Sequence, residues 1–219
     1  MEARLLVFAR APVAGATKTR LIPALGPDGA AQLHAALIAH TLAVAAVARP
    51  YELQLWHAGD DANGTLGNMA GAAGASLHRQ PEGDLGARME HALGQATADS
   101  RAAIVIGTDC PWLSGATLQE AAAMLDSAAA VIGPADDGGY VLLGLRGVAP
   151  SLFADIEWGT DKVLATTRER LAALGWGWRE LTARPDVDRP EDLDALAELG
   201  GQWTRLAQPA RRLSGKPEP

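Results

Sequence analysis

The sequence contains one cysteine, Cys110, among its 219 residues. An internal disulfide is therefore excluded, and a chain of this kind suits a reducing compartment. No charged segment followed by an apolar stretch opens the chain, so we expect no secretory signal. The apolar segment 33–47 is interrupted by His34, His40 and Thr41 and is too short to span a bilayer. We expect a cytoplasmic protein without a membrane span.

Basic charge is also scarce. The chain has 19 Lys and Arg residues against 26 Asp and Glu residues, a formal net charge of -7. Nucleic acid is disfavoured as a partner, because binding it depends on a basic surface that displaces phosphate counterions. The exception is the segment 1–20, which has four basic residues and one acidic residue. A small basic spot in an acidic protein suits a compact anion such as a nucleotide phosphate.

The two common glycine-rich nucleotide motifs are missing. Residues 8–21 read FARAPVAGATKTRL, but a P-loop needs a glycine directly before the lysine and a helix that starts there. Thr17 precedes the lysine, and Pro23 would disturb such a helix. The G-x-G-x-x-G fingerprint is absent too, which disfavours an NAD enzyme. We predict a flexible phosphate-binding loop, with a merely solvated basic loop as the alternative. Its residues are Arg10, Gly15, Lys18, Thr19 and Arg20.

Short apolar runs alternate with longer helical patterns along the chain. Strands are predicted at 5–9, 52–57, 76–79, 102–107, 129–133, 140–145 and 178–181, and helices at 27–48, 84–98, 115–127, 161–174 and 190–199. This alternation predicts an α/β fold with a largely parallel sheet covered by helices on both faces. The apolar runs within 131–143 are joined by a short turn, so one strand should run antiparallel and make the sheet mixed. We expect a single domain over 1–204 and a loose tail over 205–219.

An aspartate follows the most buried-looking strand, in the order Gly107, Thr108, Asp109, Cys110, Pro111. Ligands of open α/β sheets bind at the carboxyl ends of strands, and a carboxylate with phosphate oxygens is a usual Mg²⁺ site. We predict metal or ribose binding at Asp109, against the alternative of a turn-forming residue before the proline. The neighbouring cysteine is interpreted as a packed residue rather than a nucleophile, because no partner base is apparent.

Two further aspartates, Asp186 and Asp188, precede a predicted helix that begins at Pro190. Either could cap that helix. If Pro190 is the first helical residue, however, the cap position falls on Arg189, and Asp188 is left for another task such as a second metal carboxylate.

Three other segments carry polar or aromatic groups next to glycine. Asp84 is interpreted as the N-cap of its helix, and Arg88 could reach a phosphate or only solvent. A tight turn is predicted at residues 136–139, which are two aspartates followed by two glycines. The glycines have no side chains, so a ligand could approach the backbone closely there. Residues 158–160, Trp-Gly-Thr, supply an aromatic face and a hydroxyl just before the next predicted helix. These two segments contain Asp136, Asp137, Gly138, Gly139, Tyr140, Trp158, Gly159 and Thr160.

Taken in order, six motifs resemble a known family. They read F-A-R-x-P-x-x-G-x-x-K-T-R-L, G-D-L-G-x-R-M, I-G-T-D-C-P, G-P-A-D-D-G-G-Y, W-G-T and D-V-D-x-P-E-D-L. They resemble the small microbial A-type glycosyltransferase-like proteins, described as candidate nucleotide-diphospho-sugar transferases, with one branch named for arsenosugar biosynthesis. The resemblance covers residues 4 to 199. The fold is also similar to that of the molybdenum-cofactor and phospholactate guanylyltransferases.

This resemblance implies a Rossmann-like A-type fold with Mg²⁺ or Mn²⁺ as cofactor. The segment 10–20 would cover the nucleotide phosphates, and Asp109 with Asp188, or less favourably Asp186, would hold the metal. Residues 84–88 would border the nucleoside, with Thr108 nearby.

The resemblance places residues 136–140 and 158–160 at the sugar or acceptor. Asp136 or Asp137 is our candidate for the general base. The expected partners are a nucleotide sugar or a nucleoside triphosphate and a small-molecule acceptor.

The function we expect is metal-dependent transfer from a nucleotide-activated sugar. Residues 107–109 read Gly-Thr-Asp instead of the D-x-D of many glycosyltransferases. This departure keeps open a nucleotidyltransferase that joins a nucleoside triphosphate to a phosphorylated small molecule and releases pyrophosphate. A non-catalytic nucleotide-sugar-binding protein is the alternative from a different class.

Overall fold

The computed structural model describes residues 3–48, 51–99 and 102–208. Its sheet has seven strands, each overlapping one of the predicted strands. They are β1 (Ala3–Arg10), β2 (Tyr51–Ala58), β3 (Ser76–Arg79), β4 (Ala102–Ile106), β5 (Ala130–Pro134), β6 (Tyr140–Leu145) and β7 (Trp178–Glu180). The order across the sheet is β3-β2-β1-β4-β6-β5-β7.

The helices alternate with these strands, as predicted. They are α1 (Ile22–Val47), α2 (Thr65–Ala73), α3 (Leu85–Asp99), α4 (Gly115–Met124), α5 (Val163–Ala173), α6 (Asp192–Glu198) and α7 (Gln202–Leu206), with short 3₁₀ turns η1 (Thr19–Leu21) and η2 (Pro150–Leu152). The two short helices α2 and α7 and both 3₁₀ turns were not predicted. The structure thus confirms the mixed α/β class and adds small elements to it.

One strand runs against the others. The parallel pairs are β1 with β2, β1 with β4, β2 with β3 and β5 with β7, whereas β6 is antiparallel to both β4 and β5. Six strands therefore end at the same edge of the sheet, and β6 starts there. The predicted mixed sheet is confirmed, and β4 occupies its centre.

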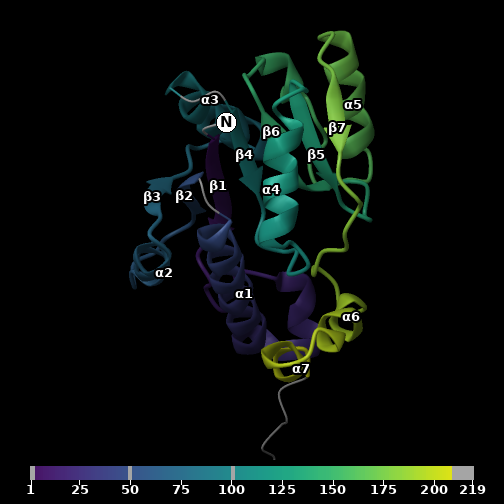
Figure 1. The fold of residues 1–219 in the computed structure, drawn as a ribbon. Coiled ribbons are helices and arrows are strands. Elements are labelled where there is room, and N and C mark those ends of the chain that lie inside the picture. The colour runs from purple at the N-terminus through teal and green to yellow at the C-terminus, as the bar shows by residue number, and fades with distance from the viewer. Residues whose placement is uncertain (1–2, 49–50, 100–101, 209–219) are drawn as a thin grey trace, which may run out of the picture. The chain divides into compact units, whose positions relative to one another are not determined.

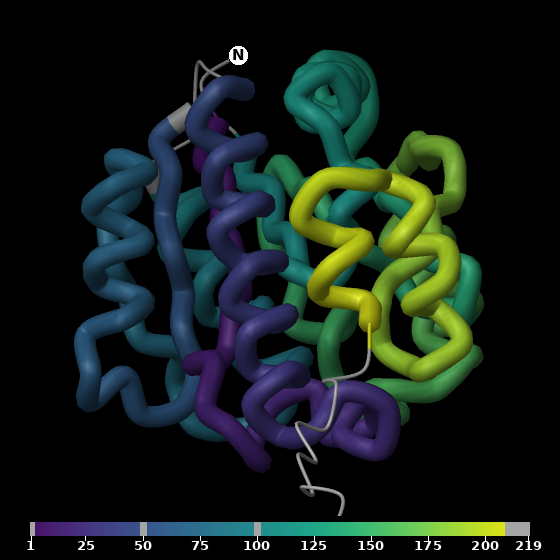
Figure 2. Tube along the Cα trace, turned by 90° about the horizontal axis from the view of Figure 1, so that it is seen from below, coloured from purple at the N-terminus to yellow at the C-terminus, as the bar shows by residue number. Residues whose placement is uncertain are grey.

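Helices cover both faces of the sheet (Figure 1). Alternate residues of β1 face opposite sides, so Leu5 and Val7 join one core cluster and Leu6 and Phe8 join the other. The first cluster includes residues of α4 and of the later part of α1, and the second includes residues of α3 and α5. Figure 2 shows α2 beside the edge strand β3 and its neighbour β2, both of which it contacts.

Helix α1 is interrupted at Gly26, whose φ of +73° is not helical, so its long part starts at Pro27, where the predicted helix starts. By length and composition alone, the segment Thr19–Val47 that contains α1 also meets the criteria of a membrane span. Half of its most apolar window is buried inside the protein, and core helices of soluble proteins meet the same criteria. Ile38 and Leu42 are two of its buried residues.

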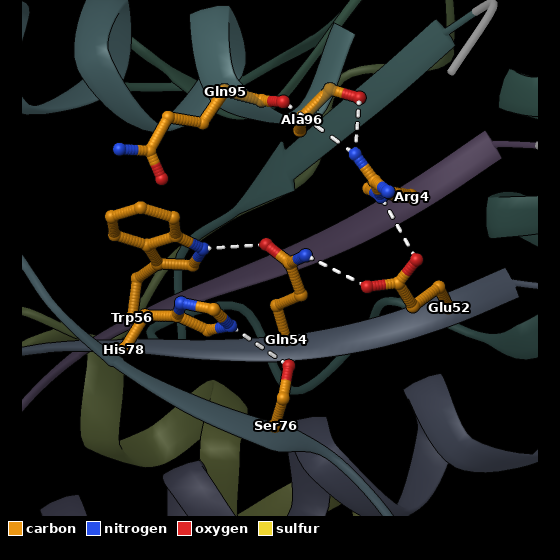
Figure 3. Close-up of polar contacts among 8 residues, drawn as sticks. All are labelled: Arg4, Glu52, Gln54, Trp56, Ser76, His78, Gln95 and Ala96. Carbon is orange, nitrogen blue, oxygen red and sulfur yellow. Dashed lines mark hydrogen bonds and ion pairs between the residues drawn. The ribbon is translucent and has the colours of Figure 1, made fainter. Parts of the chain in front are cut away.

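A polar network ties β1, β2 and α3 together on one face of the sheet (Figure 3). Arg4 donates to the Glu52 carboxylate at 2.9 Å and to the Ala96 carbonyl at 3.1 Å. Gln54 links Glu52 to the indole of Trp56 through bonds of 3.0 and 2.8 Å. The Arg4 guanidinium is the main reason that the pKa of Glu52 is lowered. The bond between Gln54 and Trp56 pairs two buried polar groups that would otherwise be costly to bury.

The described residues form two compact units. One comprises residues up to Ala11 together with Leu37–Asp186 and contains the whole sheet. The other comprises Pro12–Ala36 and the segment from Val187 onward. A single domain over 1–204 stays a prediction. Of the predicted tail, 205 and 206 are helical in α7, and residues 209–219 lie outside the described residues.

Candidate functional site

The sheet has a topological switch point between β1 and β4. The chain leaves β1 for β2 on one side and returns to β4 on the other side, and ligands of such sheets bind in the crevice that this reversal creates. Val7 of β1 pairs with Ile106 of β4, so Arg10 and Asp109 each lie three residues beyond a matched pair. Two predicted residues, Arg10 and Asp109, thus lie at the ends of adjacent strands on the same edge of the sheet. Thr108 is buried beside them, at 4% exposure.

A polar pocket of about 400 Å³ lies at the carboxyl ends of β2 and β3. Its lining residues are His57, Ala58, Gly59, Asp60, Asp61, Arg79, Gln80, Pro81, Glu82 and Arg88. Arg10 borders this pocket, because a Cβ added at Gly59 would lie 3.8 Å from its Cγ atom. Of the lining residues, only Arg88 was predicted as a site residue. The other lining residues lie at or just after the ends of the predicted strands 52–57 and 76–79, and this position was the one sign in the sequence that they could line a site.

Two charged side chains of this pocket differ in their hydrogen bonding to the protein. The Asp61 carboxylate accepts the backbone N–H groups of Leu66 and Gly67 at 3.0 and 3.1 Å, so it is occupied at the start of α2. The Nε atom of Arg88 is buried and has no hydrogen-bond partner among the described residues. A guanidinium nitrogen in that state favours an anionic ligand.

Asp84 caps α3 as predicted. Its Oδ1 atom accepts the Ala87 backbone N–H at 2.8 Å, one of the donors that the first turn of a helix leaves unpaired. The cap fixes the start of the helix that carries Arg88. A direct contact of Asp84 with a nucleotide stays a prediction.

The two candidates for the general base, Asp136 and Asp137, lie in the turn between β5 and β6 and differ in their hydrogen bonds. The Oδ1 atom of Asp137 accepts the Gly139 N–H at 2.9 Å, so this carboxylate stabilises the turn. Asp136 is exposed, and its carboxylate has no hydrogen bond among the described residues. Of the two carboxylates, Asp136 is therefore the one that the protein engages less.

Gly138 has a structural task in this turn. Its φ is +89°, and a Cβ placed there would lie 2.3 Å from the Asp161 carbonyl oxygen. Its own carbonyl accepts the Leu164 N–H at 2.9 Å. We predicted that a ligand could approach the bare backbone of this turn. At Gly138 the space beside the backbone is instead occupied by Asp161, just before α5. Its contact with a ligand stays a prediction.

Three predicted segments meet at Trp158. Its ring lies edge-on to Tyr140, with centroids 6.5 Å apart and an interplanar angle of 89°. A Cβ added at Gly86 would lie 2.8 Å from the indole Nε1 atom, so α3 packs against this indole. Burial raises the pKa of Tyr140 above its ordinary value. Thr160 donates its hydroxyl to the Glu157 carbonyl at 2.7 Å, which closes the turn behind the indole.

Cys110 is a packed residue, as predicted. It is 2% exposed, and burial raises the pKa of its thiol to about 11. The thiolate, which is the nucleophilic form, is therefore disfavoured near neutral pH.

The second unit contains the remaining predicted cations. Lys18 is not in an open loop: its side chain is 4% exposed, and its Nζ donates to the Val187 carbonyl at 2.5 Å. The Asp188 carboxylate lies 3.9 Å from that Nζ and is paired with Arg20. Thr19 is exposed, as is Gly15. The expectation of a flexible basic loop is thus corrected at Lys18.

The start of α6 differs from the prediction. The helix begins at Asp192 rather than Pro190, and the Asp192 carboxylate accepts the N–H groups of Asp188 and Arg189 at 2.8 and 2.6 Å. Asp192 therefore organises the turn before the helix. Asp188 is not a cap, but the helix start at Pro190, on which its assignment to another task depended, is wrong. Its carboxylate is engaged by cations of its own unit.

Lys18→Ala is expected to lower the free energy of unfolding by about 1.5–3 kcal/mol, because it removes a charged donor and leaves the Val187 carbonyl without it. Arg20→Ala is the matched control. Its side chain is 59% exposed, and exposed ion pairs contribute about 1 kcal/mol or less. Urea unfolding of both variants measures the difference. Equal, small losses would show that the buried contact of Lys18 contributes nothing specific.

No group of three or more metal-ligating side chains exists in the part of the chain that the structure describes. A divalent metal at Asp109 would therefore need oxygens from a bound phosphate. This donor set suits Mg²⁺, which is commonly held by one or two carboxylates and substrate phosphates. The residues present fit such a metal.

Solved structures share this fold. A protein from Desulfovibrio desulfuricans G20, named as a candidate nucleotide-diphospho-sugar transferase, is 29% identical over 94% of both chains, with a TM-score of 0.84. CMP:2-keto-3-deoxy-manno-octonic acid synthetase in complex with CTP is 13% identical over 92% of this chain and 99% of its own, with a TM-score of 0.57. Rv0371c from Mycobacterium tuberculosis H37Rv, in complex with manganese, is 20% identical over 90% and 99%, with a TM-score of 0.58.

These likenesses identify the protein as a transferase with a nucleotide-diphospho-sugar transferase and nucleotidyltransferase fold. No curated protein matches the sequence. A family pattern matches residues 41–160, more than half of the chain. The chain therefore belongs to the family described as "Uncharacterized protein conserved in bacteria (DUF2064)".

Proposed function

We propose that the protein transfers a sugar from a nucleotide-diphospho-sugar to a small acceptor with the help of Mg²⁺ or Mn²⁺. The observation that carries this proposal is the matched position of Arg10 and Asp109 beyond β1 and β4, at the switch point of the sheet. A guanidinium and a carboxylate that follow adjacent strands suit a diphosphate with its metal. The 29% identical transferase from Desulfovibrio desulfuricans supports the donor class.

The nucleoside is assigned to the pocket at the ends of β2 and β3. The pocket opens beside Arg10, and Arg88 offers it a buried Nε atom without a partner among the described residues. The Asp84 cap holds the helix that presents this guanidinium. A nucleoside in this pocket would direct its phosphates toward Arg10.

A divalent metal at this site would be held by Asp109 and the donor's phosphate oxygens, with Asp188 as the proposed second carboxylate. When bound, it would stabilise the negative charge that develops on the leaving diphosphate. Arg10 contributes to the same task from β1. Arg20, Lys18, Thr19 and Gly15 are proposed to cover the phosphates, which requires the cations to exchange Asp188 and Val187 for phosphate oxygens. A manganese complex of Rv0371c agrees with the metal class.

The acceptor is assigned to the β5–β6 turn and to the segment around Trp158. Asp136 is the proposed general base, because Asp137 is engaged by the Gly139 N–H. The Trp158 ring and the Tyr140 ring, which lie edge-on to each other, would form an apolar wall for the sugar or acceptor, with Thr160 behind it.

Nucleotidyl transfer is the second candidate. Gly107 stands where a D-x-D motif has its first aspartate, so separated aspartates would have to bind the metal. The synthetase that binds CTP has the same fold. In that reaction a phosphorylated acceptor attacks a nucleoside triphosphate, and pyrophosphate leaves. The arsenosugar branch of the resembling family, the cytoplasmic location and a non-catalytic nucleotide-sugar binder stay predictions.

A thermal-shift panel of nucleoside triphosphates and nucleotide sugars, with and without Mg²⁺ or Mn²⁺, tests the proposal. A ligand at about 100 times its dissociation constant should add about 2.7 kcal/mol of stability. We expect metal-dependent stabilisation that Arg88→Gln weakens and that the exposed-surface control Arg179→Gln leaves intact. Nucleoside diphosphate release then indicates glycosyl transfer, and pyrophosphate release indicates nucleotidyl transfer. No response to any nucleotide would refute both reactions.

A further inference from the structure

Arg184 is fixed at the same edge of the sheet, on the far side from the nucleoside pocket. Its backbone N–H donates to the Pro134 carbonyl at 3.0 Å, and its carbonyl accepts the Asp136 N–H at 3.2 Å. It also forms a parallel bridge with Ala135. Arg184 is thereby held at the end of β5, next to the turn that presents Asp136.

One nitrogen of the Arg184 guanidinium is buried without a hydrogen-bond acceptor in the described part of the chain. Its Nε atom is buried and has no hydrogen-bond partner among the described residues. The backbone of Arg184 thus lies beside the end of β5 and the turn that presents Asp136, in the region proposed for the acceptor.

An unsatisfied, partly buried guanidinium costs stability, because the group gives up water without gaining an acceptor. A bound oxyanion removes that cost. The planar fork of arginine matches the two oxygens of a carboxylate or phosphate.

We propose that Arg184 binds an anionic group, a carboxylate or a phosphate, on the acceptor. This inference rests on the proposed transfer reaction. Three strands, β1, β4 and β6, separate β5 from the β2 and β3 pocket. The acceptor and the nucleoside are therefore bound on opposite sides of Asp109. Because Arg184 and Asp136 are joined through the backbone, an acceptor held by its anion would have a hydroxyl near the proposed base.

The side-chain Nε–Hε resonance of Arg184 in the ¹⁵N-labelled full chain tests this directly. Inorganic phosphate and acetate are titrated separately at constant ionic strength. We expect the Arg184 resonance, assigned by its loss in Arg184→Lys, to shift with saturation in at least one titration. The control is Arg179, an exposed residue of the neighbouring strand β7, whose resonance should not saturate. If the lysine variant does not fold, through-bond correlation to the Arg184 backbone amide gives the assignment in the unmodified protein.

The anion that saturates the signal identifies the acceptor group: acetate indicates a carboxylate, and phosphate indicates a phosphate ester. An Arg184 resonance that behaves like that of Arg179 with both anions would overturn the inference. So would displacement of the anion by a nucleotide sugar or a nucleoside triphosphate, because the site would then belong to the nucleotide. Saturation at Arg184 with no nucleotide response anywhere leaves the anion site standing and refutes only the proposed function.

Discussion

Asp109→Asn is expected to reduce the transfer rate by about 100-fold to 1,000-fold, the effect of removing one main source of charge stabilisation from a transition state. The asparagine keeps the size of the side chain but lacks the negative charge that would hold the cation. Asp109 follows a central, fully buried strand, so its position is set by β4 rather than by a mobile loop. Thermal shift with a nucleotide should lose its metal-dependent part in this variant.

Asp126→Asn is the control for this change. Asp126 is an exposed aspartate just after α4, remote in sequence from every proposed ligand-binding segment. It should keep both the transfer rate and the metal-dependent thermal shift. An Asp109→Asn variant that still shows the full metal-dependent stabilisation would contradict the assignment of Asp109 to the metal.

Gly138→Ala is expected to lower the free energy of unfolding by about 2–4 kcal/mol. Its φ of +89° is unfavourable for alanine, and the added Cβ would lie 2.3 Å from the Asp161 carbonyl oxygen and 2.7 Å from its Cα atom. Because both of those atoms belong to backbone, a side-chain rotation cannot relieve the contact. Chemical unfolding monitored by circular dichroism measures the loss.

Gly159→Ala separates the two causes of that loss. Gly159 also has a positive φ, +81°, but a Cβ there would meet nothing within 4 Å. It should cost about 1–2 kcal/mol, the strain of the backbone conformation alone. Equal losses in the two variants would mean that the close approach of Gly138 to Asp161 adds nothing to stability.

The strands were predicted closely because their signals are local. Strands β3 and β6 have the predicted bounds, and the unbroken apolar run of β4 marks it as the centre of the sheet, since both of its faces are buried. The short turn before Tyr140 correctly predicted that β5 and β6 pair antiparallel. Because β1 and β4 are parallel neighbours, Arg10 and Asp109 lie at the same edge of the sheet, where the strands have their carboxyl ends.

Helix boundaries were less predictable, because capping groups compete. Pro190 indicated a helix start by its preference for the first turn, but the Asp192 carboxylate binds the N–H groups before it and delays the helix to Asp192. The helix α2 was missed because its sequence, TLGNMAGAA, contains two glycines and little periodic contrast. Asp61 compensates by accepting N–H groups at its start.

The sequence by itself determined the α/β class, the central strand of the sheet and the polar segments at the strand ends. These features depend on periodicity and turn chemistry, which act over a few residues. Tertiary structure decided which groups are free. Lys18 is buried by a bond to Val187, 169 residues away, and Gly138 is filled by Asp161. Arg184 remains unsatisfied for the same reason. A side chain's partners depend on residues brought together by folding, and no local pattern encodes them.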